Sequence, residues 1–220
     1  MINNKVVNII SIMLIFLGLS MIPSILFSIY YNEFDFKGIA YSSLITVLSG
    51  IILFIITKYF NINKKHKELV LKDGFAIVSL GWIVISIFSA FPYFFSLNNL
   101  SFIDCFFESM SGLTTTGATI FGSNGLIIED LSHGLLFWRS FTHFIGGMGI
   151  IVFSIAILPL LGIGGVQLFK AEVAGPTTDT ISPRIKETAK LLWGIYIAFV
   201  ITLSLILYLQ GMTYFDAICH

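Results

Sequence analysis

The residues best suited to chemistry in this chain form one short uncharged stretch, Ser-Gly-Leu-Thr-Thr-Thr-Gly-Ala-Thr, at positions 111–119. A dehydrated monovalent cation needs several oxygens. Backbone carbonyls and threonine hydroxyls supply them without a full negative charge that would trap the ion. Glycine permits carbonyl orientations that a side chain would forbid. The stretch therefore predicts backbone that faces a small polar species such as a cation.

The other reactive side chains do not form a recognisable catalytic set. An intramembrane enzyme would need a nucleophile with a base, or metal ligands, and the candidates are Asp104, Cys105, His133 and His143. Their spacing matches no HExxH-like ligand pattern, so the sequence does not predict an enzyme. Cys105 and Cys219 indicate neither a disulfide framework nor a metal site.

The elements that must position the uncharged stretch are membrane helices. Hydrophobic residues make up 56% of the 220 residues and charged residues only 11%, a balance that excludes an ordinary soluble domain. About 20 apolar residues cross the hydrocarbon core. The apolar runs thus predict an all-α integral membrane protein whose five spanning helices lie at about 6–31, 38–60, 75–96, 134–161 and 191–210. The first run is too long for a signal-peptide core and lacks a small-residue cleavage site, so we expect it in the mature protein.

The orientation follows from the basic residues. If the five helices alternate, ten of the twelve Lys and Arg residues fall on one side, whereas Lys37 falls on the other and Arg139 lies within a helix. Positive charge marks the cytoplasmic side, which predicts a multi-pass protein of the plasma (inner) membrane with a cytoplasmic N-terminus. Lipid is the expected surrounding and no nucleic-acid partner is expected; the net charge of zero itself says nothing about nucleic acid, because the charges are sorted by side. The ten residues are Lys5, Lys58, Lys64, Lys65, Lys67, Lys72, Lys170, Arg184, Lys186 and Lys190.

A short amphipathic helix is predicted just before the Thr/Gly run, over 101–113. Its apolar residues recur at helical spacing, while Asp104, Glu108 and Ser111 share another face. Thirteen residues rise roughly 20 Å, too little to span the membrane. Either this helix enters the membrane as part of a re-entrant pore loop, or it lies on the outer surface before a flexible loop; the Thr-Thr-Thr-Gly run favours the pore loop. In that case the C-terminal end of the helix, which carries about half a negative charge, favours a cation below it.

Three charged residues are expected to support the pore loop. Asp104 would cap or anchor the short helix near the outer interface. Arg139, near the outer end of the fourth span, is interpreted as a structural anchor that meets Glu108, Glu129 or Asp130, because an unpaired charge in the membrane is costly. For Glu108 two roles stay open: a buried hydrogen-bond acceptor behind the loop, or a carboxylate that faces the ion.

The segments SFIDCFFESMSGLTTTGAT and FWRSFTHFIGGMGIIVFSIAILPLLGIGGVQLFKAEVAGPTTDTISPRIKETAKLLWGIYI resemble the TrkH branch of the TrkH/KtrB potassium-uptake proteins. Two helices before the first pore unit favour TrkH over KtrB. The resemblance implies a channel-like pore made of four helix–pore-loop–helix units, in which Thr115, Thr116, Gly117 and Ala118 form the first quarter of a selectivity filter. It further implies potassium as the transported ion, bound at Thr115, Thr116 and Gly117, with no organic cofactor in this chain. A cytosolic nucleotide-binding regulatory subunit of the TrkA type and a homodimeric full-length form are the implied partners.

An internal repeat sets the expected domain organisation. SFIDCFFE at 101–108 aligns with TYFDAICH at 213–220, which pairs Asp104 with Asp216. We therefore expect a transmembrane hairpin and basic loop at 1–72, a first pore unit at 73–161, a cytoplasmic linker at 162–190 and the start of a second pore unit at 191–220. With one filter quarter of four, the chain alone is expected to insert but not to conduct selectively. The alternatives are a truncated, non-conducting piece of such a transporter and a self-assembling cation channel.

Overall fold

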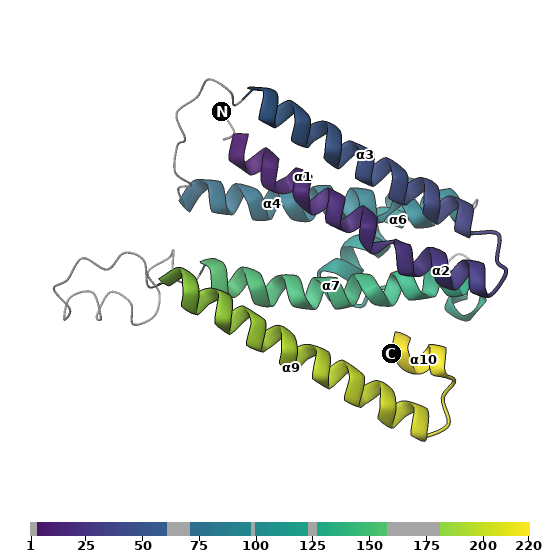
Figure 1. The fold of residues 1–220 in the computed structure, drawn as a ribbon. Coiled ribbons are helices and arrows are strands. Elements are labelled where there is room, and N and C mark those ends of the chain that lie inside the picture. Colours follow the sequence, from purple (N-terminus) through teal and green to yellow (C-terminus); the bar gives the residue numbers. More distant parts are fainter. Residues whose placement is uncertain (1–3, 61–70, 98–99, 123–126, 158–180) are drawn as a thin grey trace. The chain divides into compact units, whose positions relative to one another are not determined.

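The computed structural model describes residues 4–60, 71–97, 100–122, 127–157 and 181–220. All regular elements in these ranges are helices (Figure 1), which confirms the all-α class. The chain divides into two compact units, 1–144 and 145–220, and the division falls inside one long helix.

The first unit begins with a helical hairpin. Helices α1 (Asn4–Ser20) and α2 (Ile22–Tyr30) form its first arm, and α3 (Phe36–Phe60) returns antiparallel to them (Figure 1). The sequence predicted one uninterrupted helix here, but the structure breaks it at Met21, just before Pro23. Proline has no N–H to donate and its ring clashes with the preceding turn, so a helix breaks or kinks there.

The same device recurs in the next arm, where α4 (Leu71–Ser89) is followed after one residue by α5 (Phe91–Ser96), with Pro92 at the start of α5. Helix α1 packs against both α3 and α4. The α1–α3 contact is close enough for the Ser43 hydroxyl to donate to the Gly18 carbonyl at 2.7 Å. Small residues let membrane helices approach each other in this way.

Two further helices complete the first unit. The short helix α6 (Phe102–Leu113) matches the predicted 101–113, and α7 (His133–Ile157) follows it after the single turn η1 (Ile128–Asp130). Helix α6 packs against α4 and α5. The largest fully buried side chain, Trp138 of α7, donates its indole N–H to the Ser89 carbonyl at 3.1 Å. This bond fixes α7 against the end of α4.

The second unit comprises the end of α7, helix α9 (Ile181–Leu209) and helix α10 (Tyr214–Cys219). Helices α7 and α9 are close at Gly147, where an added Cβ would stand 2.8 Å from the Tyr196 hydroxyl. Helix α9 begins at Ile181, well before the predicted position near 191. The prediction used hydropathy alone and therefore began the span after the charged residues at 184–190. Arg, Lys and Glu are good helix formers, so the helix extends back through part of the predicted linker.

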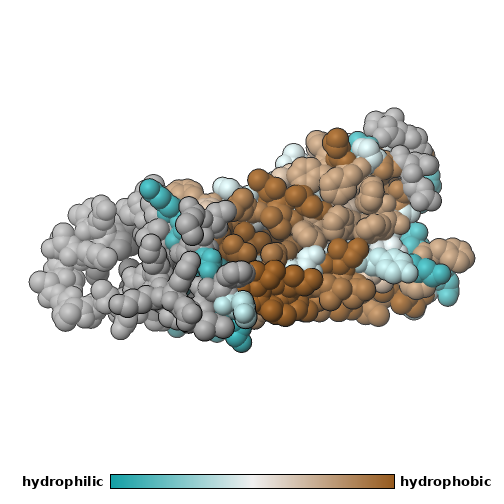
Figure 2. All heavy atoms as spheres, turned by 90° about the horizontal axis from the view of Figure 1, so that it is seen from above, coloured by the Kyte–Doolittle hydropathy of each residue, from teal (hydrophilic) through white to brown (hydrophobic). Residues whose placement is uncertain are grey.

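Four helices in the described ranges have the length and apolar composition to cross a membrane. They are Asn4–Tyr30, Phe36–Tyr59, Lys72–Ser96 and Glu187–Leu209. The remaining predicted span, the fourth along the chain, corresponds to α7, which runs for 25 residues from His133 to Ile157; its predicted end at 161 lies outside the described residues. Figure 2 shows a largely apolar face over the described helices, with hydrophilic residues toward their ends. Such a surface suits a lipid environment.

Candidate ion-filter site

The start of α6 is fixed by a reciprocal cap. The Ser101 hydroxyl accepts from the Asp104 backbone N–H at 3.2 Å, and the Asp104 carboxylate accepts from the Ser101 backbone N–H at 3.2 Å. The Ser101 hydroxyl also lies 2.8 Å from the Asp104 carboxylate. Because the first N–H groups of a helix have no partner within it, this capping box holds the N-terminus in place. Asp104 thus lies at the helix start, where the sequence placed it.

The end of α6 is closed by a Schellman turn. The Thr116 N–H donates to the Ser111 carbonyl at 3.0 Å, and the Thr115 N–H donates to the Gly112 carbonyl at 2.9 Å. This turn needs one residue in the left-handed region, and here that residue is Thr115, with φ of +56°. A β-branched residue rarely adopts such a φ. The first residues of the predicted filter therefore lie in strained backbone directly after the short helix.

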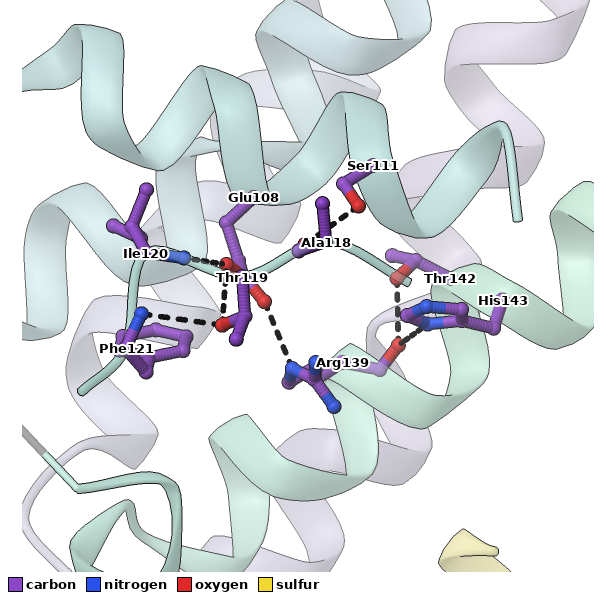
Figure 3. A network of polar contacts seen from close by, with 9 residues as sticks. All are labelled: Glu108, Ser111, Ala118, Thr119, Ile120, Phe121, Arg139, Thr142 and His143. Atoms are coloured by element: carbon purple, nitrogen blue, oxygen red, sulfur yellow. Dashed lines mark hydrogen bonds and ion pairs between the residues drawn. The ribbon is translucent and has the colours of Figure 1, made fainter. Parts of the chain in front are cut away.

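The chain then returns along α6 and is held there by two side chains of that helix (Figure 3). The Ser111 hydroxyl donates to the Ala118 carbonyl at 2.6 Å. One carboxylate oxygen of Glu108 accepts from the Thr119 hydroxyl at 2.9 Å and from the Ile120 N–H at 3.1 Å. The shared face that the sequence predicted for Glu108 and Ser111 thus faces the returning chain.

The second carboxylate oxygen of Glu108 accepts from Nε of Arg139 at 2.8 Å. Glu108 is buried, and Arg139 is one-fifth exposed. Of the three acidic partners that the sequence offered to Arg139, Glu108 makes this contact. The geometry matches the interpretation of Glu108 as a buried acceptor behind the loop. Its three bonds use most of the roughly four acceptor sites of a carboxylate, and they point toward Arg139 and the returning chain.

Arg139 also takes part in contacts within its own helix. Its backbone carbonyl accepts from the Thr142 hydroxyl at 2.7 Å and lies 2.9 Å from Nδ1 of His143 (Figure 3). His143 therefore makes a hydrogen bond within α7 through Nδ1.

Burial separates the site into a support and a presented surface. Glu108, Ser109, Ser111 and Leu113 are buried, whereas all six residues from Thr114 to Thr119 are exposed. Those six carry hydroxyls and carbonyls but no charge. Such a surface can contribute neutral oxygen ligands to a cation, provided other oxygens complete the shell.

The sequence did not predict which residues of the returning chain bind the side chains of α6. Thr119 and Ile120 were given no role, although both bond to Glu108. The one available signal was the i, i+3 spacing of Glu108 and Ser111, which placed two polar side chains on one face of an otherwise apolar helix. A hydrogen bond from a backbone N–H, such as that of Ile120, cannot be predicted from the pattern of side chains.

Fold and site together define a helical membrane protein in which a short helix presents a buttressed, uncharged loop. Comparison with known proteins gives the family. The model of the TrkH cation transport proteins matches residues 43–220. The chain therefore belongs to the TrkH family, which places it among transport proteins rather than enzymes.

Similar proteins support this assignment over nearly the whole chain. The Trk system potassium uptake protein TrkH of Vibrio parahaemolyticus is 42% identical over 219 residues, 98% of this chain. TrkH of Escherichia coli K12 is 49% identical over 161 residues, 72% of this chain. The crystal structure of the potassium transporter TrkH from Vibrio parahaemolyticus superposes with a TM-score of 0.81 at 36% identity and covers 100% of this chain. The chain spans 43%, 32% and 42% of the lengths of these three proteins, respectively.

Proposed function

We propose that the loop 114–119 contributes one quarter of a potassium-selective filter in a Trk-type uptake system, with Thr115, Thr116, Gly117 and Ala118 as its ion-facing residues. The potassium part of this proposal is supported by the similar proteins, which are potassium uptake proteins of Trk systems. The filter part is supported by the conformation of the loop and by its attachment.

The backbone of the loop alternates in handedness. The φ angle is −82° at Thr114, +56° at Thr115 and +75° at Gly117, and it is negative at Thr116 and Ala118. Alternation of right- and left-handed residues gathers successive N–H groups on one side of the chain, as in anion-binding nests. The carbonyl oxygens of Thr115, Thr116 and Gly117 would then gather on the opposite side, as a cation requires, whereas the Ala118 carbonyl accepts from the Ser111 hydroxyl of the support.

The strain at Thr115 is the observation that carries the proposal. A left-handed conformation costs an ordinary L-residue roughly 1–2 kcal/mol, and such strain concentrates at functional sites. Thr115 is exposed, so packing does not explain a threonine there. Its hydroxyl donates to the Thr114 carbonyl at 2.7 Å, a bond that uses the hydroxyl hydrogen but not the oxygen lone pairs, and that oxygen and the Thr115 carbonyl are the groups that an ion would use.

The support behind the loop fits the same role. A filter must keep its carbonyls at a fixed spacing while ions pass, and mobile oxygens would follow whichever ion enters. Glu108 and Ser111 hold the returning chain through three hydrogen bonds of 2.6–3.1 Å, and Arg139 holds Glu108 through a fourth of 2.8 Å. Asp104 fixes the other end of the same helix.

The orientation and partners extend this proposal to the whole protein. Helix α1 begins, α3 ends and α4 begins at one end of the first unit (Figure 1), and Lys5, Lys58 and Lys72 lie at those helix ends. This clustering supports a cytoplasmic N-terminus in the plasma membrane. Family membership supports a homodimer that works with a TrkA-type cytosolic nucleotide-binding subunit.

The test is Gly117→Ser in the full-length protein, with Gly122→Ser as its matched control. Both glycines have positive φ, +75° and +98°, and an added Cβ would meet nothing within 4 Å at either. The two substitutions therefore carry a similar backbone cost, but only Gly117 lies in the proposed filter. We expect Gly117→Ser to reduce discrimination between potassium and sodium in rubidium-uptake competition, and Gly122→Ser to leave it intact.

Protein amounts in the membrane fraction normalise the comparison. Unchanged selectivity in Gly117→Ser at normal expression would refute the filter assignment. Equal loss in both variants would show that the effect comes from backbone strain rather than from ion coordination.

A further inference from the structure

A second carboxylate, Glu33, reaches the same support from the N-terminal hairpin. It lies in the connection between α2 and α3, and its target is the first turn of α7, 100 residues further along the chain. We propose that Glu33 is a positioning residue for the filter loop, which it controls through α7. This inference rests on the filter role proposed above.

The connection that presents Glu33 is rigid. Helix α2 ends in a Schellman turn in which the Asn32 N–H donates to the Ile29 carbonyl at 3.0 Å and the Glu33 N–H donates to the Ser28 carbonyl at 2.9 Å. Asn32 takes the left-handed position with φ of +56°, and asparagine tolerates that conformation. The backbone of Glu33 is therefore held at a fixed place beyond the end of α2.

The side chain of Glu33 caps α7. One carboxylate oxygen accepts from the His133 backbone N–H at 3.0 Å and lies 2.7 Å from Nδ1 of the same residue; the other accepts from the Gly134 N–H at 3.4 Å. The next N–H, that of Leu135, donates to the Ser132 hydroxyl at 3.3 Å. A helix start leaves such N–H groups without partners in the helix, and it favours negative charge. The hairpin thus supplies the capping charge of α7.

Packing around the cap makes this contact tight. The Tyr31 ring stacks on the His133 ring with centroids 3.6 Å apart, and Phe27 meets Phe137 at 4.7 Å. A Cβ on Gly134 would stand 2.8 Å from Cβ of Ser28, so the start of α7 leaves no room for a side chain there. A change at Glu33 is therefore expected to move α7 rather than be absorbed by a loose surface.

Arg139 lies six residues after His133, about 9 Å along the helix at 1.5 Å per residue. Its guanidinium binds Glu108, and Glu108 binds Thr119 and Ile120 of the loop. Trp138, next to Arg139, is fully buried and limits rotation of the helix. A displacement of α7 at its start is thus passed to the position of the Glu108 carboxylate and of the loop that it holds.

The experiment uses the full-length protein with Glu33→Gln, which keeps the size of the side chain but removes its charge. Asp35→Asn is the matched control, because Asp35 lies two residues away with the same charge and takes no part in the bonds to α7. Mutations along a contiguous network change coupling by about 0.5–2 kcal/mol. We expect Glu33→Gln to lower the potassium-to-sodium selectivity by about twofold to thirtyfold, and Asp35→Asn to leave it unchanged.

A double-mutant cycle separates positioning from a general loss of stability. Thr119→Val removes the hydroxyl bond to Glu108 at the other end of the path. If Glu33 acts through Glu108, the selectivity loss of the double variant is smaller than the sum of the two single losses, since residues in one network are not additive. Should Glu33→Gln fail to accumulate, His133→Ala takes its place in the cycle; it removes the Nδ1 contact of the cap and the stacking on Tyr31 but keeps the backbone N–H that donates to Glu33.

Two outcomes overturn the proposal: selectivity like the wild type in Glu33→Gln, or a double variant whose losses simply add. Gly117→Ser distinguishes the two levels of failure. If Gly117→Ser changes selectivity and Glu33→Gln does not, the positioning role alone is refuted. If neither variant changes selectivity, the filter assignment itself has failed.

Discussion

Helices α6 and α9 end in the same kind of turn but use different residues. At the end of α9 the Met212 N–H donates to the Leu207 carbonyl at 3.2 Å, and the Gly211 N–H donates to the Tyr208 carbonyl at 3.0 Å. The corresponding bonds at the end of α6 come from Thr116 and Thr115. The left-handed position is thus glycine in one helix, with φ of +102°, and threonine in the other, with φ of +56°.

This difference indicates that the end of α6 has a role beyond reversing the chain direction. Glycine takes the left-handed conformation without steric cost, so the end of α9 is what folding alone would select. The end of α6 accepts the cost of a β-branched residue and needs compensation from elsewhere. The bonds that Glu108 makes to Arg139 and to the returning chain supply it.

The largest effect is therefore expected from Glu108→Ala in the full-length protein. Removal of one partner from a buried ion pair typically costs about 3–5 kcal/mol, here with two loop bonds lost as well. We expect a lower thermal midpoint in detergent and loss of rubidium uptake. Asp130→Asn, an exposed acidic residue in η1, is the control and should behave like the wild type. Normal uptake and stability in Glu108→Ala would show that the loop holds itself in place.

A reciprocal exchange at the two turns should give smaller effects of opposite sign. Thr115→Gly relieves the strain and is expected to raise stability by about 0.5–1 kcal/mol after the added freedom of glycine in the unfolded chain, while selectivity falls. Gly211→Thr places a β-branched residue at a positive φ and, with the same allowance for the freedom of glycine in the unfolded chain, should lower stability by about 0.5–1 kcal/mol. Thermal midpoints measured together with rubidium–sodium competition test both. Unchanged selectivity in Thr115→Gly would mean that the threonine side chain does not contribute to the filter.

The local structure of α6 could be predicted from the sequence. The short helix, its apolar spacing and the polar run after it predicted α6 within one residue at its start. These are local signals, because helical periodicity and capping depend on residues three or four positions apart. The breaks before Pro23 and Pro92 were equally local but were overlooked, because hydropathy runs smoothly across both.

The contacts that join distant segments could not be predicted in the same way. The sequence offered three acidic residues as ion-pair partners for Arg139. Only the way α6 packs against α7 selects Glu108 among them. Glu33 and His133 are 100 residues apart, with no pattern that links them. A carboxylate in a short connection looks like any solvated residue until the helix start that it caps is known.

The smallest effects on stability are expected at the N-termini of α6 and α10, the two segments that the predicted repeat aligns. Thr213 and Asp216 cap α10 as Ser101 and Asp104 cap α6: the Asp216 N–H donates to the Thr213 hydroxyl at 3.1 Å, and that hydroxyl lies 2.6 Å from the Asp216 carboxylate. Because a cap acts locally, Ser101→Ala and Thr213→Ala should each cost about 1 kcal/mol.

Hydrogen exchange of the two helix starts measures this directly. A loss of about 1 kcal/mol corresponds to roughly fivefold faster exchange of the amides that the cap protects. Thr202→Ala, in the middle of α9, is the control, since its hydroxyl bonds only to the Ala198 carbonyl of the same helix. Equal acceleration in α6 and α10 would mean that the two copies share their starts and that α6 is distinguished by its strained end. Acceleration in α10 alone would contradict this, because it would mean that the buttress behind the loop also holds the start of α6.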